Sequence, residues 1–171
     1  DRIDRIVTLD DAATPMPATG DARVVAVATD IGTPKRVGGV DPQRLREIYR
    51  EREFDVCVLK ADGARARWIK SPGEHEPVLP DFATTDIPVV SVRVVGRPLD
   101  ERIAHRPERL TALLGIRAGA RIEAGHLAAL LSHPQGALKG VGEARVIPLI
   151  NMVDDDRLHE LARGIARAAL T

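Results

Sequence analysis

Residues 55–64 read DVCVLKADGA, an apolar run that ends in an acidic turn. The centre of the run, Val56–Leu59, is almost continuously apolar, which is typical of a strand covered on both faces of a sheet. Cys57 lies between two valines, so we expect its thiol to be buried as a small hydrophobe. Asp62 and the glycine after it are residues that turns prefer. The stretch therefore predicts a strand over 55–60 inside a parallel sheet.

Strand and helix patterns alternate along the rest of the chain. Runs rich in β-branched residues predict further strands over 23–29, 87–95 and 145–150. Apolar residues at helical spacing predict helices from Pro42 onward, over 107–114, over 123–132 and from Asp154 towards the C-terminus. This alternation indicates a three-layer α/β fold, a mostly parallel sheet with helices on both faces. We expect a single α/β domain over residues 1–171.

Composition limits the classes of partner. The 171 residues are 44% hydrophobic and 29% charged, which is typical of a globular domain. Zero net charge and 2% aromatic residues argue against binding to nucleic acid. A single cysteine excludes an internal disulfide and favours a reducing, cytoplasmic location. No apolar run approaches the roughly 20 residues of a membrane span, so we expect no membrane partner.

The first polar strand end is at Asp62. In open α/β sheets, ligands bind beyond the carboxyl ends of the strands. An acidic residue just after an apolar strand is the Walker B arrangement, in which the carboxylate holds Mg²⁺ opposite the phosphates of a nucleotide. Lys60, two residues earlier, is a candidate to neutralise a phosphate. The alternative interpretation is that Asp62 is a simple turn residue.

The second polar strand end, residues 151–154, reads NMVD and resembles the N-K-x-D signature of GTPases. In that signature the aspartate accepts hydrogen bonds from guanine, and the lysine packs along the ring. Asn151 and Asp154 match, whereas Met152 replaces the lysine and offers a thioether that can cover a base. We expect Asp62 and Asp154 to project into a common crevice. The alternative is that Asp154 is only the N-cap of the last helix.

No G-x-x-x-x-G-K-[ST] phosphate loop occurs in these residues. The stretch Gly32–Gly39 has glycines and Lys35, but in the wrong order. Residues 62–80 form the most distinctive polar segment, with Lys70 and with two prolines that stiffen the backbone around Glu74-His75-Glu76. Adjacent side chains of an extended chain point in opposite directions, so we expect no structural metal there.

That segment has two other interpretations, a salt-bridged loop or a set of acid–base groups. Arg106 is a candidate partner for Glu74 or Glu76, or for a ligand phosphate. Lys139 lies near the end of the glycine-flanked loop 133–140. This loop is a candidate for a phosphate contact or a lid, and the alternative is an ordinary surface loop.

Together these motifs resemble one family. They are Ala61-Asp62-Gly63-Ala64, Lys70-Ser71-Pro72, Glu74-His75-Glu76-Pro77, His105-Arg106, Gly136 with Lys139-Gly140, and Asn151-Met152-Val153-Asp154. Their order and approximate spacing, from about Val37 to the C-terminus, resemble the YqeC family of selenium-dependent hydroxylase accessory proteins.

The resemblance implies a P-loop NTPase-like protein whose G-G-K-T type loop would lie before Asp1. It also implies GTP or ATP with Mg²⁺ as cofactor, held by Asp62, Asn151 and Asp154, and a molybdenum hydroxylase as client. GTPase or ATPase activity is implied only if the phosphate loop is present. Lys60 replaces an acidic residue of the family pattern, which leaves Asp62 as the sole Walker B-type carboxylate. The alternative is a non-enzymatic module that carries a selenium or molybdopterin intermediate and has a vestigial nucleotide site.

Overall fold

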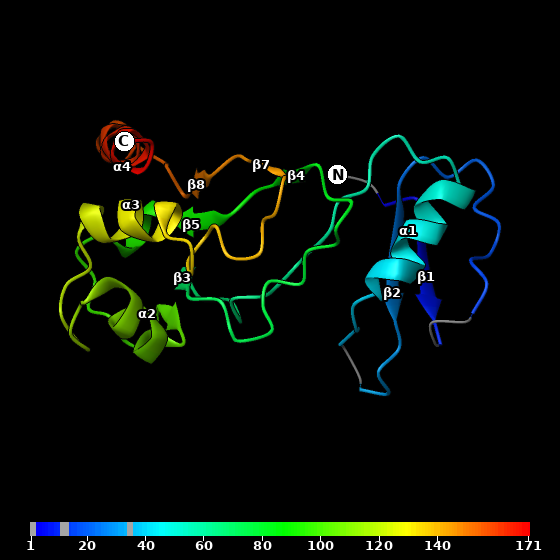
Figure 1. Cartoon of the computed structure of the whole chain (residues 1–171), viewed down its shortest axis with the longest axis horizontal. Helices are drawn as coiled ribbons and strands as arrows, with labels where there is room; N and C mark the ends of the chain where they lie inside the picture. Colours follow the sequence, from blue (N-terminus) through cyan, green and yellow to red (C-terminus); the bar gives the residue numbers. More distant parts are fainter. Residues whose placement is uncertain (1–2, 11–13, 34–35) are drawn as a thin grey trace. The chain divides into compact units, whose positions relative to one another are not determined.

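The structure is a computed structural model that describes residues 3–10, 14–33 and 36–171, so Lys35 lies outside the described residues. The chain divides into two compact units, residues 1–59 and 60–171, and each is described by itself (Figure 1). The single domain expected over 1–171 stays a prediction. No described helix has both the length and the apolar character that a membrane span requires.

The described residues of the first unit form a parallel strand pair with one helix. Strands β1 (Arg5–Leu9) and β2 (Val25–Thr29) pair over their full length, and β2 confirms the core of the strand expected over 23–29. Helix α1 (Pro42–Glu51) begins as predicted, because the Asp41 carboxylate accepts hydrogen bonds from two backbone amides of the first turn. A small apolar core holds the unit together: Val7, Leu9, Met16 and Ile48.

The second unit contains three short parallel ladders. They pair β3 (Ile69–Lys70) with β6 (Ala104–His105), β4 (Thr85–Asp86) with β7 (Arg145–Val146), and β5 (Val89–Ser91) with β8 (Leu149–Asn151). The Leu149 amide donates to the Pro88 carbonyl and continues the β4–β7 ladder into β5–β8. The Ser91 amide donates to the carbonyl of Trp68, which links β5 to the residue before β3. The carboxyl ends of these strands carry the candidate site.

Two of the expected strands are interrupted. The strand predicted over 145–150 is divided into β7 and β8, and the one predicted over 87–95 is limited to β5. Pro88 and Pro148 interrupt them because proline has no N–H to donate to a ladder. After Ser91 the chain turns into the 3₁₀ helix η1 (Val92–Val94), whose first turn is closed by the Ser91 hydroxyl.

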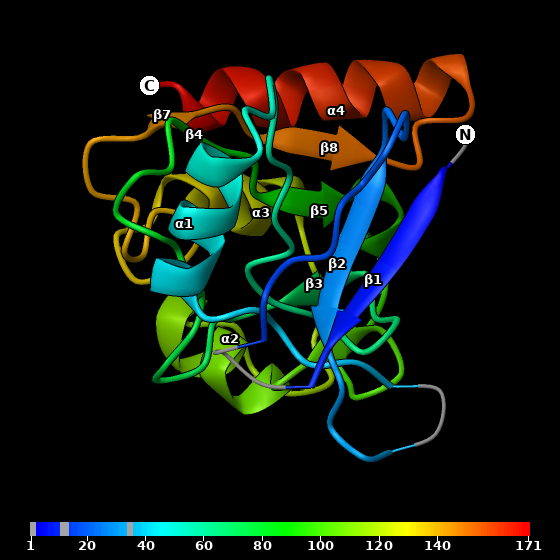
Figure 2. The same ribbon diagram turned by 90° about the vertical axis from the view of Figure 1, so that its right-hand side faces the viewer.

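Three helices complete the second unit. Helices α2 (Pro107–Leu114), α3 (Ala124–Ser132) and α4 (Asp156–Ala169) confirm the helical predictions. Helices α3 and α4 pack against each other, and Figure 2 shows α4 along its length. The core is aliphatic, and the largest fully buried side chains in it are Leu99, Leu110, Leu127, Ile165, Val92 and Val94. The mixed α/β class with parallel pairing is confirmed, while the three-layer P-loop arrangement stays a prediction.

The strand predicted over 55–60 was wrong. This segment has no strand assignment and no ladder to any described residue. Val56 is 73% exposed and Val58 is 89% exposed, and Cys57 is exposed rather than buried. The apolar pattern alone does not make a strand, because extended backbone is held by hydrogen bonds to a neighbouring strand. Asp62 therefore follows an unpaired segment.

Candidate functional site

Four charged side chains meet at the carboxyl end of the β3–β6 pair: Asp62, Lys70, Glu76 and Arg106, here called the ion-pair cluster. Lys70 ends β3 and Arg106 directly follows β6, so the parallel register places both at one end. Lys70 Nζ lies 2.7 Å from Asp62 Oδ2 and 2.7 Å from Glu76 Oε2. Arg106 donates two hydrogen bonds to Glu76, at 2.6 and 3.0 Å. Of the partners considered for Arg106, the structure shows Glu76 and not Glu74.

The cluster shifts the acid–base behaviour of its members and neighbours. The Arg106 guanidinium, helped by Lys70 and the Gly73 amide, holds the pKa of Glu76 far below its usual range. Burial, then the positive charges of Arg106 and nearby cations, lower the pKa of His105, which is therefore neutral at pH 7. Burial and the Asp62 carboxylate raise the pKa of Asp86. Glu76 and Arg106 therefore both stay charged at neutral pH, since the pKa of Arg106 is raised by the same pairing.

The segment between Lys70 and Glu76 is held by cations from two other segments. Arg106 lies against Gly73, where an added Cβ would come within 3.2 Å of the guanidinium carbon. Lys139 donates hydrogen bonds to the carbonyls of Gly73 and Glu74. The side chains of Glu74 and His75 stay exposed. Among the described residues no group of three or more acidic, histidine or cysteine side chains could hold a metal ion.

The β5–β8 end brings a different set of side chains together. Asn151 ends β8 beside Ser91, and the Ser91 hydroxyl donates to the Met152 sulfur at 3.1 Å. Asn151 Oδ1 is buried, and no hydrogen-bond partner is found for it among the described residues. Asp154 pairs with Arg93 at 2.6 Å, and both side chains are about half exposed. This end therefore presents a buried unpaired acceptor next to an exposed ion pair.

The N-cap alternative for Asp154 was wrong. The cap of α4 is Asp155, whose carboxylate accepts a hydrogen bond from the Leu158 amide at 2.7 Å. Asp62 and Asp154 pair with different cations, and no described contact joins them. The common crevice expected for them stays a prediction. Lys60 is exposed. Its ammonium lies near Gly63, where an added Cβ would be 2.8 Å from Lys60 Nζ.

Sequence reasoning missed the cations that accompany the predicted residues. Arg93 lies inside the strand predicted over 87–95 and was not predicted as a site residue, whereas in the structure it lies in η1 and pairs with Asp154. Arg109, on α2, and Lys139 both contact the segment after β3, and both line a pocket there. Asp86 was not predicted as a site residue. Its pKa is raised by burial and by Asp62, and neither can be inferred from its neighbours in the sequence.

Fold and site define a mixed α/β protein whose short parallel strands end in charged and polar side chains. The chain belongs to the YqeC family: the family model described as YqeC protein matches residues 3–108. It is 32% identical over 136 residues to the uncharacterized protein YqeC of Escherichia coli (strain K12). That alignment covers 79% of this chain and 51% of the relative, so the chain spans about half the relative's length. No solved structure matches the chain.

Proposed function

We propose that this protein binds a purine nucleotide with Mg²⁺ at the carboxyl ends of its parallel strands. In this proposal it serves as an accessory factor in the maturation of selenium-dependent molybdenum hydroxylases. The nucleotide proposal is carried by Asn151 Oδ1, buried at the end of β8 without a described partner. Buried acceptors are nearly always paired, so an unpaired one at the ligand-binding edge of a sheet suits a donor from a ligand. The client class is proposed from the sequence resemblance.

The base would be recognised at the β5–β8 end. Asn151 would accept one N–H group, and Asp154 would accept further hydrogen bonds after Arg93 moves aside. Separating this pair costs little, since exposed ion pairs contribute only about 0–1 kcal/mol. Met152, next to the Ser91 hydroxyl, would cover one face of the base with its thioether.

The phosphates would lie near Asp62. One Asp62 oxygen accepts from Lys70, and the carboxylate has a second oxygen that suits a magnesium-bound water. Lys60, Lys70, Arg106 and Lys139 are candidates for phosphate contacts. Magnesium would supply charge neutralisation for the phosphates, and this donor set is compatible with it because carboxylate oxygens are the protein ligands it prefers.

Calorimetric titration with GTP and ATP in the presence of Mg²⁺ tests the nucleotide proposal. We expect saturable binding, weakened at least about tenfold in Asp154→Asn, because a carboxylate that accepts N–H donors contributes roughly 1.5–3 kcal/mol. Asp156→Asn is the matched control, since Asp156 also lies at the start of α4 and should leave affinity unchanged. Absence of binding at millimolar nucleotide would refute the proposal.

The ion-pair cluster favours a second function, a non-enzymatic module that carries a selenium or molybdopterin intermediate. Its two carboxylates are already paired with two cations, so no charge in it requires a nucleotide. In this case Asp62→Ala should still capture a molybdenum hydroxylase, and nucleotide should not change the amount captured. Capture that depends on nucleotide and is lost in Asp62→Ala would favour the first function.

A further inference from the structure

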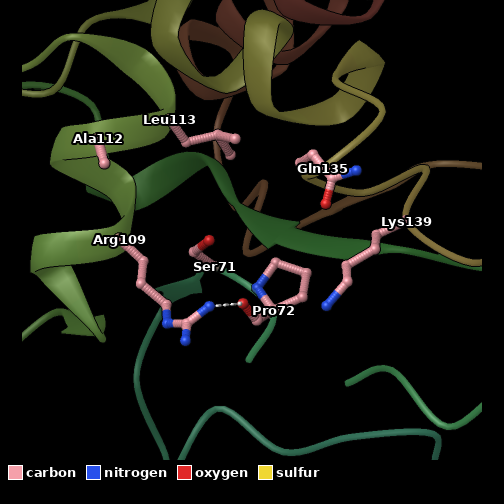
Figure 3. Close-up of a pocket in the computed structure, with 7 residues that line it drawn as sticks. All are labelled: Ser71, Pro72, Arg109, Ala112, Leu113, Gln135 and Lys139. Carbon is pink, nitrogen blue, oxygen red and sulfur yellow. Dashed lines mark hydrogen bonds between the residues drawn. The ribbon is translucent and has the colours of Figure 1, made fainter. Parts of the chain in front are cut away.

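A pocket of about 260 Å³ opens beside the end of β3. Three segments form it: the residues directly after β3, the exposed side of α2, and the glycine-flanked loop after α3. Figure 3 shows the seven residues that line it, Ser71, Pro72, Arg109, Ala112, Leu113, Gln135 and Lys139. None of the residues proposed to bind the nucleotide base or its magnesium is among them.

The lining is positively charged. Arg109 and Lys139 lie on either side of Pro72 (Figure 3), and no acidic residue lines the pocket. Arg109 makes one long hydrogen bond, 3.4 Å, to the Pro72 carbonyl. Lys139 donates to the carbonyls of Gly73 and Glu74, which are neutral acceptors. Neither of these contacts cancels the charge of its cation, so the pocket has two positive charges available for a ligand.

The other lining residues divide the pocket into a polar and an apolar part. Ser71 is only 4% exposed and borders the pocket with its hydroxyl, and Gln135 adds an amide. Pro72, Ala112 and Leu113 supply apolar surface. Two cations with a hydroxyl and an amide suit the oxygens of an anion, and the apolar residues suit a short hydrocarbon group attached to it.

The loop that carries Lys139 is held in place before any ligand binds. The Ala137 amide donates to the Leu130 carbonyl at the end of α3. Gly136 packs so closely there that an added Cβ would lie 2.6 Å from the Leu130 carbonyl oxygen. The Lys139 ammonium is therefore fixed over the segment after β3, which lowers the entropic cost of using it to bind a ligand.

We propose that this pocket is a second binding site, for a small organic anion with a phosphate or carboxylate group and a short apolar part. Arg109 and Lys139 would hold the anionic group, with Ser71 and Gln135 as hydrogen-bond partners. Leu113 and Pro72 would contact the apolar part. Lys139 is also a candidate phosphate contact of the proposed nucleotide site, whereas Arg109 belongs to the pocket alone.

Titrations with phenyl phosphate, benzoate and inorganic phosphate, followed by backbone amide NMR, test this proposal. We expect saturable shifts at the amides of Ala112 and Gln135. Affinity for phenyl phosphate should fall about tenfold or more in Arg109→Gln, since the neutral amide cannot make a charge-assisted hydrogen bond to the anion. Arg117→Gln, at another exposed arginine outside the pocket, should bind like the wild type. Preference for phenyl phosphate or for benzoate identifies the anionic group.

Equal affinities in the Arg109 and Arg117 variants would overturn the proposal, as would shifts that do not saturate at millimolar probe. Asn151→Leu separates the two sites. Phenyl phosphate binding that survives in Asn151→Leu and is weakened in Arg109→Gln supports the pocket, whatever the nucleotide titrations give. Loss of that binding in Asn151→Leu would show that the pocket is not a separate site.

Discussion

The two strand ends of the second unit satisfy their polar groups in opposite ways. In the ion-pair cluster at the β3–β6 end, four half-buried charges pair with one another, and their side chains are 12–28% exposed. At the β5–β8 end, Asn151 Oδ1 is buried without a described partner and Asp154 makes only an exposed pair with Arg93. The first arrangement is complete without a ligand, whereas the second leaves an acceptor to be satisfied.

This difference separates a carboxylate that is fully engaged by its neighbours from an acceptor that has no described partner. A paired and partly buried carboxylate such as Glu76 stabilises the segment around it and would lose those contacts on binding something else. An unpaired buried acceptor costs stability, and a cost of this kind is typical of a binding site. The family match over residues 3–108 includes the ion-pair cluster and ends before Asn151. The residues matched by the family model therefore include all four members of the ion-pair cluster.

Glu76→Gln should have the largest effect on stability. The neutral amide cannot balance Lys70 and Arg106, which would then face only Asp62. We expect the free energy of unfolding to fall by about 2 kcal/mol, a value near the low end for charged hydrogen bonds because the site is partly exposed. Urea unfolding measures it. Glu74→Gln, at an exposed position two residues away, should change stability by less than about 0.5 kcal/mol. Equal losses in the two variants would contradict a stabilising role for the cluster.

Lowering the pH should remove the stabilisation that the Glu76 carboxylate contributes. The pKa of Glu76 is lowered in the folded state from an ordinary value of 4.5, so the stabilisation is complete above that pH. As the pH falls below about 4.5, the unfolded chain binds the proton first, and stability decreases with pH. The difference in unfolding free energy between wild type and Glu76→Gln should therefore be constant near neutral pH and shrink on acidification. A difference that stays constant down to pH 3 would refute this.

The helices could be predicted from the sequence because their signals are local. Asp41 followed by Pro42 gives a cap and a first turn, and Gly115 ends α2 in the left-handed region, at φ 67°. The strands could be predicted only in part. The run at Val56–Leu59 has a strand pattern but no described neighbour, and sequence alone does not say which run obtains one.

The candidate site shows the same limit. For Arg106 the sequence narrowed the carboxylate partner to Glu74 or Glu76, and only the structure decides for Glu76. The pairing of Asp154 with Arg93 depends on residues 61 positions apart that meet only through β5 and β8. Arg109 was not predicted as a pocket residue because nothing in its local sequence distinguishes it from other surface arginines.

Asn151→Leu should raise the free energy of unfolding, whereas most substitutions lower it. Leucine has a similar shape and removes the buried acceptor, so we expect the protein to gain about 1 kcal/mol in unfolding free energy. Nucleotide binding should be lost at the same time if the proposed function holds. Thermal unfolding and calorimetry on one sample measure both. A destabilised variant would indicate that Asn151 Oδ1 already has a partner in solution.

Arg93→Gln should have the smallest effect, because its ion pair is about half exposed on both sides. Exposed pairs contribute roughly 0–1 kcal/mol and are screened by salt, so we expect a loss below about 0.5 kcal/mol that disappears at 1 M NaCl. Removing Arg93 also frees Asp154. In the proposed function the base no longer has to displace the arginine, so GTP affinity should stay equal or rise slightly. A large loss of stability would show that the β5–β8 end is held by its charges in the same way as the ion-pair cluster, and the contrast between the two strand ends would then be wrong.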